Sequence, residues 1–166
     1  MCGIIGFTGR KPAKDILIDG LERLEYRGYD SAGIALLNDD DTLTIRKKAG
    51  RVSELRELCK DGDYSSTCGI GHTRWATHGG VTDANAHPHR CGNVALIHNG
   101  IIENYSDIIR EYGLADKLVS ETDSEVVAAL LDTLYDGDPI AAIRKAVKII
   151  AGSFALCIMF ADRPGI

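Results

Sequence analysis

Cys2 directly follows the initiator methionine, and this position gives its thiol a chemical possibility that an internal cysteine lacks. Removal of Met1 would leave a free α-amine that titrates at about 7.7–8 beside a thiol that titrates at about 8.5. The amine can then accept the thiol proton, so that one residue supplies both the nucleophile and its general base. A cysteine that merely begins a buried strand would occupy the same position. The hypothesis therefore needs an oxyanion hole and a substrate clamp elsewhere in the chain.

A second candidate group lies in residues 71–80, where arginine, threonine, tryptophan and histidine occur together at the end of a strand-like run. The guanidinium of Arg74 can hold a carboxylate through two parallel hydrogen bonds. Thr77 and His78 add neutral donors beside it. The two glycines that end the segment, after Trp75, fit a loop that closes over a substrate, because glycine absorbs a change in backbone angles. The alternatives are a surface ion pair for the arginine and a core position for the tryptophan.

A third group is His98-Asn99-Gly100, at the end of an apolar strand-like run. The amide of Asn99 and the backbone N–H of Gly100 can form an oxyanion hole. An Asn-Gly hairpin turn is the alternative, since the same dipeptide is common there. Asp123 stands at a helix start, where capping is the ordinary role of aspartate. It could instead pair the ammonium group of a free amino acid whose carboxylate is held by Arg74.

The elements that must position these residues alternate irregularly between strand and helix. A Gly/Pro/His-rich connection from Ala76 to Gly92 is the longest one, and long connections often carry function. Antiparallel sheet packed against helices, an α+β fold, is therefore favoured over a doubly wound parallel sheet. Strands are expected in CGIIGFTG, SAGIALLN, TLTIRKKAG, TCGIGHTRW, VALIHNG and SFALCIMFAD, with the second and third forming a hairpin through an acidic turn. Helices are expected after Pro12 at a first turn and over 52–59, 104–112, 123–135 and 139–150.

Length and composition bound the class of protein. The chain has 166 residues and 45% hydrophobic content, which fits one domain with a sizeable core. With 19 basic and 24 acidic residues, its net charge of -5 favours neither nucleic acid nor an anionic membrane as partner. No signal peptide or membrane span is expected, so the predicted location is cytoplasmic. Five cysteines without CxxC spacing indicate reduced thiols, with Cys68 and Cys157 as small buried hydrophobes.

Six strings resemble the successive signatures of class II glutamine amidotransferases, and among them those of the glucosamine-6-phosphate synthase family. The match runs from Cys2 to about Asp123 and continues loosely to Asp162. The resemblance implies an N-terminal-nucleophile αββα sandwich, in which two antiparallel sheets lie between helix layers. The strings are MCGIIGFTG, LEYRGYDSAG, GHTRWATHG, NAHPH, HNGIIEN and SETDSE.

The same resemblance implies a role for each candidate residue, and it implies neither a metal nor another cofactor. The pattern His87-Pro88-His89-x-Cys91 raises the alternative of a zinc site, but it has no fourth ligand and the NAHPH match accounts for it. The implied roles are nucleophile and base for Cys2, oxyanion stabilisers for Asn99 and Gly100, glutamine binders for Arg74, Thr77, His78 and Asp123, closing-loop residue for Trp75, and support of the site for Arg27 and His87.

The activity implied by the resemblance is hydrolysis of L-glutamine to glutamate and ammonia through a Cys2 thioester. In the family, ammonia passes to a C-terminal isomerase domain that binds fructose 6-phosphate, and the full-length enzyme is expected to be a homodimer. Residues 1–166 are interpreted as one glutaminase domain, incomplete at its C-terminal end, with the isomerase domain absent. Two alternatives stay open, namely an inactive or unprocessed glutamine-binding module and a histidine/cysteine metal protein.

Overall fold

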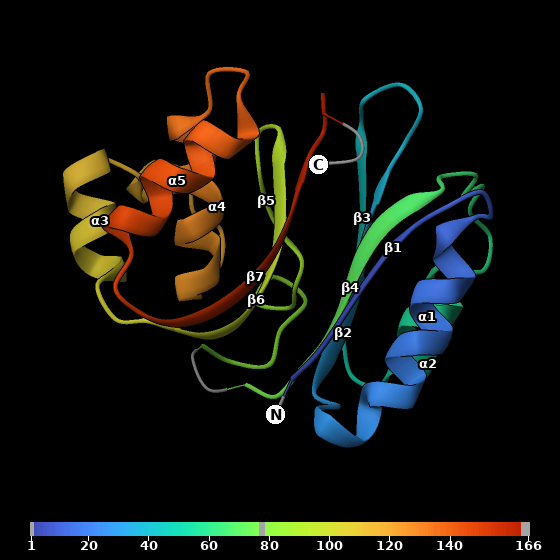
Figure 1. Ribbon diagram of the computed structural model, residues 1–166. Coiled ribbons are helices and arrows are strands. Elements are labelled where there is room, and N and C mark those ends of the chain that lie inside the picture. Colours follow the sequence, from blue (N-terminus) through green and yellow to red (C-terminus); the bar gives the residue numbers. More distant parts are fainter. Residues whose placement is uncertain (1, 77–78, 164–166) are drawn as a thin grey trace.

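Two antiparallel sheets lie face to face in the computed structural model, with helices on the outer side of each sheet (Figure 1). The structure describes residues 2–76 and 79–163. None of the helices within these ranges is both long and apolar enough to cross a bilayer. In chain order the elements are β1 (Gly3–Thr8), α1 (Ala13–Leu24), η1 (Glu25–Arg27), β2 (Ser31–Leu37), β3 (Leu43–Ala49), α2 (Val52–Leu58), β4 (Cys68–Arg74), β5 (His89–Cys91), β6 (Val94–Ile102), α3 (Tyr105–Tyr112), η2 (Ala115–Lys117), α4 (Asp123–Leu134), α5 (Pro139–Ile149) and β7 (Gly152–Phe160).

The first sheet has the strand order β1-β4-β2-β3, so β4 lies between β1 and β2. The expected hairpin of β2 and β3 is confirmed, because these strands pair from Ser31 opposite Ala49 to Leu37 opposite Leu43. Asp41 closes the acidic turn between them with a φ of 60°. The second sheet has the order β5-β6-β7, in which β6 pairs with β7 along its whole length.

Three apolar clusters fill the spaces between the layers. One joins α1 and α2 to the first sheet, one lies between the two sheets, and one joins α3, α4 and α5 to the second sheet. Successive side chains of a strand point to opposite faces, and each sheet therefore contributes one face to the helices and one to the other sheet. The result is a helix–sheet–sheet–helix sandwich.

The same alternation decides where the polar ends of β4 and β6 point. On β4, Ile70 packs between the sheets, so His72 and Arg74 lie on that same face. On β6, Ile97 packs between the sheets and Asn99 follows it on that face. His98 lies on the opposite face, toward α4. The strand ends therefore bring polar side chains from both sheets into one region.

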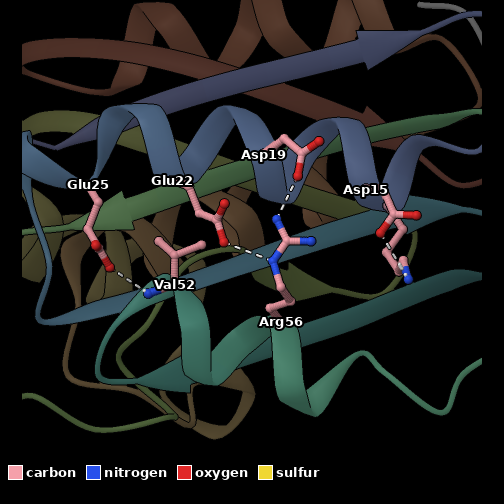
Figure 2. A network of polar contacts seen from close by, with 7 residues as sticks. Asp15, Asp19, Glu22, Glu25, Val52 and Arg56 are labelled. Atoms are coloured by element: carbon pink, nitrogen blue, oxygen red, sulfur yellow. Dashed lines mark hydrogen bonds and ion pairs between the residues drawn. The ribbon is translucent and has the colours of Figure 1, made fainter.

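A polar network fastens α2 to α1 on the outer side of the first sheet (Figure 2). Arg56 of α2 donates from Nε to Glu22 at 2.8 Å and from Nη2 to Asp19 at 2.6 Å. Glu25, just after α1, accepts the backbone N–H of Val52 at 2.8 Å. These contacts hold the start of α2 against the segment that leads from α1 toward β2.

Several local predictions were wrong. Asn99-Gly100 does not form a hairpin turn, because both residues lie inside β6 and pair with Ala155 and Phe154 of β7. The connection from 76 to 92 contains a short strand, β5. Pro12 is the residue before α1 and not part of its first turn.

Cys68 and Cys157 were predicted to be buried, but both are only partly buried. They line an apolar cavity of about 330 Å³ between the sheets. Burial of each thiol by the surrounding apolar strands still raises its pKa above the usual value. Their surroundings therefore favour the protonated thiol over the thiolate at both residues.

Candidate active site

Cys2 lies immediately before β1, between the ends of β4 and β6. The backbone N–H of Trp75 donates to its sulfur at 3.2 Å, and the Nδ2 group of Asn99 donates to its carbonyl at 3.3 Å. The next residue, Gly3, donates its N–H to the Thr73 hydroxyl at 3.1 Å. Strand pairing and these contacts therefore fix the start of the chain against both sheets.

One pocket collects Cys2 and most of the other residues that the sequence singled out. Thr77 and His78 lie outside the described residues. Arg27 is described, but it is not one of the residues that line the pocket. The pocket is lined by the predicted residues Cys2, Arg74, Trp75, His87, Asn99, Gly100 and Asp123, together with His72, His98, Thr122 and Ser124.

Arg74 is buried, with 4% of its surface exposed, and the surface ion pair proposed for it as an alternative is therefore wrong. Its Nη1 donates to the carbonyl of Gly80 at 3.0 Å. Gly80 in turn donates its N–H to Glu121 at 3.1 Å. The hydrogen bond from Asn85 lowers the pKa of the Glu121 carboxyl and keeps it ionised. Hydrogen bonds to Arg74 and to the ionised Glu121 thus hold Gly80 in place.

Asp123 is the first residue of α4, but it does not cap that helix. Thr122 is the cap, since its hydroxyl accepts the backbone N–H of Glu125 at 3.3 Å. The Asp123 carboxylate accepts the N–H of Ile102 at 2.8 Å and lines the pocket. Only 6% of Asp123 is exposed, and it therefore places a buried negative charge beside Cys2 and Asn99. That charge suits the ammonium group of an amino acid.

Trp75 lines the pocket, and the segment before β2 contacts Trp75 and Ala76 from outside it. Trp75 is 49% exposed, so its alternative interpretation as a core residue is wrong. Its ring meets Tyr29 edge-on, with centroids 5.4 Å apart. Ala76 donates its N–H to the carboxylate of Asp30. Arg27, predicted to support the site, ends η1 in this same segment and is partly buried.

A group of four buried histidines lies at the pocket, and the resemblance implied a role in the site for His87 alone. The ring of His87 stacks on His72 with centroids 4.2 Å apart and meets His89 edge-on at 4.6 Å. His98 joins them by donating its backbone N–H to Nδ1 of His87 at 3.2 Å. Burial lowers the pKa of all four, that of His72 to about 4. These imidazoles are therefore neutral at neutral pH.

Each histidine in this group uses a ring nitrogen to hold another part of the site. Nε2 of His72 lies 2.9 Å from Oδ1 of Asn99, and Nδ1 of His98 lies 2.8 Å from the hydroxyl of Ser124, beside Asp123. The sequence interpretation named both residues within candidate segments but gave neither of them a role, because the partner of each lies on another element. Within residues 2–76 and 79–163, no set of three or more His, Cys, Asp or Glu side chains is arranged to hold a metal ion.

Comparison with solved structures defines the class of protein. The glutamine phosphoribosylpyrophosphate amidotransferase from B. subtilis, solved with ADP and GMP, superposes with a TM-score of 0.80 at 26% identity. The alignment covers 97% of this chain and 35% of that one. The fold is that of the N-terminal-nucleophile amidotransferases, which confirms the predicted α+β sandwich of two antiparallel sheets.

The sequence comparison then defines the family. Residues 72–165 match the family described as glutamine amidotransferase domain, and this chain belongs to that family. Over 99% of its length, the chain is 51% identical to the isomerizing glutamine–fructose-6-phosphate aminotransferase of Caldanaerobacter subterraneus and 51% identical to that of Fusobacterium nucleatum. It spans only 27% and 28% of the lengths of these two relatives.

Proposed function

We propose that this domain hydrolyses L-glutamine to glutamate and ammonia, with Cys2 as the nucleophile. The observation that carries the proposal is the shared pocket, in which a thiol, an amide, a buried carboxylate and a buried guanidinium converge. The carboxylate of Asp123 and the guanidinium of Arg74 match the two charged groups of a free amino acid. The thiol of Cys2 and the amide of Asn99 match the needs of acyl transfer.

The proposed reaction begins once Met1 has been removed. The free amine of Cys2 takes the thiol proton, and the thiolate attacks the side-chain carbonyl carbon of glutamine. The new oxyanion accepts hydrogen bonds from Asn99 Nδ2 and the N–H of Gly100. The carbon–nitrogen bond then breaks, the proton held by the amine passes to the leaving nitrogen, and ammonia departs from a thioester. Water attacks the thioester and releases glutamate.

Substrate recognition is assigned to five further side chains. Arg74 binds the carboxylate of glutamine, and Asp123 binds its ammonium group, while Thr77 and His78 add neutral donors. Trp75 closes over the bound substrate. Arg27 and His87 support the site, and the burial of His87 against two other histidine rings agrees with a supporting role.

For the longer protein, we propose that the ammonia converts fructose 6-phosphate to glucosamine 6-phosphate on an isomerase domain, and that the enzyme is a cytoplasmic homodimer. The two relatives are named glutamine–fructose-6-phosphate aminotransferases, and these names support fructose 6-phosphate as the acceptor of the ammonia. In this proposal residues 1–166 are the glutaminase portion. Ammonia release in the absence of a sugar phosphate and its transfer in the presence of one are separate measurements, and only the second tests this step.

The test of the proposed function is labelling with an electrophilic glutamine analogue such as 6-diazo-5-oxo-L-norleucine, followed by intact-mass analysis and peptide mapping. The expected product has lost Met1 and carries one equivalent of label on Cys2, and excess L-glutamine slows its formation. Cys2→Ala should abolish both labelling and ammonia release, while Cys157→Ala should leave both intact because Cys157 lies in the apolar cavity between the sheets. Stoichiometric label on another cysteine, or none on Cys2, would overturn the proposal.

A further inference from the structure

His72 lines the pocket and reaches the candidate oxyanion hole from the neighbouring sheet, where it contacts Asn99. It lies on β4, paired with Ile4 on one side and Gly33 on the other, and only 1% of it is exposed. Its side chain projects into the space between the sheets, where Asn99 projects from β6. The two meet at 2.9 Å, between Nε2 of the imidazole and Oδ1 of the amide.

The orientation of the Asn99 amide follows from its two contacts. The backbone oxygen of Cys2 can only accept a hydrogen bond, so the nitrogen end of the amide faces Cys2, at 3.3 Å. The oxygen end then faces His72, and an amide oxygen can only accept. Nε2 of His72 must therefore carry the proton that it donates. The reverse tautomer would place a bare nitrogen against an amide oxygen, and the amide would rotate to relieve their repulsion.

The ring of His72 is itself held in place by its surroundings. His87 stacks on it with an angle of 18° between the ring planes, and the Nδ1 atom of His87 is fixed by the backbone N–H of His98. The carbonyl of His87 lies so close to the sheet that a Cβ on Gly33 would come within 2.2 Å of it. Burial lowers the pKa of His72 to about 4, so its ring is neutral at neutral pH and carries one proton. That proton must be on Nε2 for the ring to donate a hydrogen bond to Oδ1 of Asn99.

We infer that His72, in its Nε2–H tautomer, is the positioning residue that keeps the NH2 end of the Asn99 amide turned toward Cys2. The inference rests on the proposed function, in which that NH2 group stabilises the oxyanion. An amide turned the other way would present its oxygen to the developing negative charge and would repel it. His72 therefore acts on the chemical step and not on the binding of glutamine, which Arg74 and Asp123 provide.

The kinetic test compares two substitutions that differ by one methylene. The amide nitrogen of glutamine falls near the position of the histidine Nε2, whereas that of asparagine falls near Nδ1 and cannot reach Asn99. His72→Asn should lower kcat about 100-fold, the typical effect of losing one oxyanion donor, with KM for glutamine changed less than about threefold. His72→Gln should recover most of this loss. In an Asn99→Ala background, His72→Asn should slow ammonia release no further, because the group that it positions is gone.

A spectroscopic measurement keeps the inference testable even where a variant folds poorly. Two-bond ¹H–¹⁵N correlation spectra of the unsubstituted protein distinguish the two neutral tautomers of each imidazole, and His72 is expected to show a protonated Nε2. A protonated Nδ1, or an unchanged kcat in folded His72→Asn, would overturn the inference. Failure of the unsubstituted protein to release ammonia would instead count against the proposed function, and the tautomer of His72 would still be measured.

Discussion

Gly100 shows at the level of a single residue how strand geometry limits the choice of amino acid at the site. Its φ of +137° is a conformation that side chains rarely adopt, and a Cβ there would lie 1.9 Å from the carbonyl oxygen of Ser153. The backbone of β7 cannot move away without breaking its pairing with β6. The backbone conformation and the close approach of β7 therefore require glycine at this position, whatever its role in the reaction.

Gly100→Ala should accordingly lower the free energy of unfolding by about 3 kcal/mol, from backbone strain and the clash with β7. Gly113→Ala is the matched control, because Gly113 also has a positive φ, of 62°, but has nothing within 4 Å of the position of a Cβ. The control should cost only about 1 kcal/mol. Urea denaturation followed by circular dichroism measures both values. Equal losses for the two variants would show that β7 yields to the added methyl group.

The chemistry of the site was more predictable than its support. Cys2, Asn99 and Asp123 each had an ordinary structural alternative, but their residue types together with the resemblance singled them out, and the structure places all three in one pocket. His72 and Ser124 were not singled out, because each has a role only through a partner that lies on another element. The packing of β4 against β6 across the sandwich is a tertiary contact. Alternation along each strand predicts which face a side chain points to, but it does not predict which residue of the other sheet it will contact.

At the scale of elements, the start of α2 depends on a residue from another helix. Arg51, which precedes the helix, makes no capping hydrogen bond with its side chain, and the Glu25 carboxylate accepts the N–H of Val52 instead (Figure 2). An acidic group at a helix N-terminus is favoured both by this hydrogen bond and by the helix dipole. The cap also ties α2 to the segment that runs from α1 to Tyr29, whose ring contacts Trp75 of the pocket.

Glu25→Ala should lower the free energy of unfolding by about 1 kcal/mol, the usual effect of losing a cap, and Glu25→Gln should lower it by less because it keeps an acceptor. Arg56→Met, which removes two exposed ion pairs with α1, should have an effect below about 1 kcal/mol that shrinks with added salt. Chemical denaturation at low and high ionic strength provides the comparison. A salt-sensitive loss in Glu25→Ala as large as in Arg56→Met would contradict a capping role.

The α-helices were located to within about one residue at most of their ends, since their apolar residues recur at helical spacing over seven or more positions. The strand β5 has three residues and was not expected, because such a run is too short to show alternation. The hairpin turn considered for Asn99-Gly100 was wrong for a different reason. The local preference of this dipeptide for a turn is overridden by the ladder between β6 and β7, which continues past it to Ile102.

At the scale of the whole molecule, the sandwich buries four uncharged histidines at positions that apolar side chains could have filled. His72, His87, His89 and His98 each have a pKa lowered by burial, and the positive charge of Arg74 lowers the pKa of the first three further. In the unfolded chain these side chains titrate at about 6.5. Below that pH the histidines bind protons in the unfolded chain but stay neutral in the folded one. The free energy of unfolding should therefore fall as the pH decreases from about 7 toward 4.

For His72 alone, a pKa lowered from 6.5 to about 4 corresponds to about 3 kcal/mol in total, of which about 2 kcal/mol should disappear between about pH 7.5 and about pH 5. Asp40, Asp83 and Glu121 also have lowered pKa values, but their ordinary pKa values are 3.8 or 4.5. They therefore change the pH dependence of stability mainly below this pH range. Urea denaturation at the two pH values should therefore show a large loss for the unsubstituted protein and a smaller one for His72→Gln, which lacks one of the titrating groups. Equal stability at both pH values would mean that the folded protein accepts these protons, and burial could not then be what holds the histidines neutral.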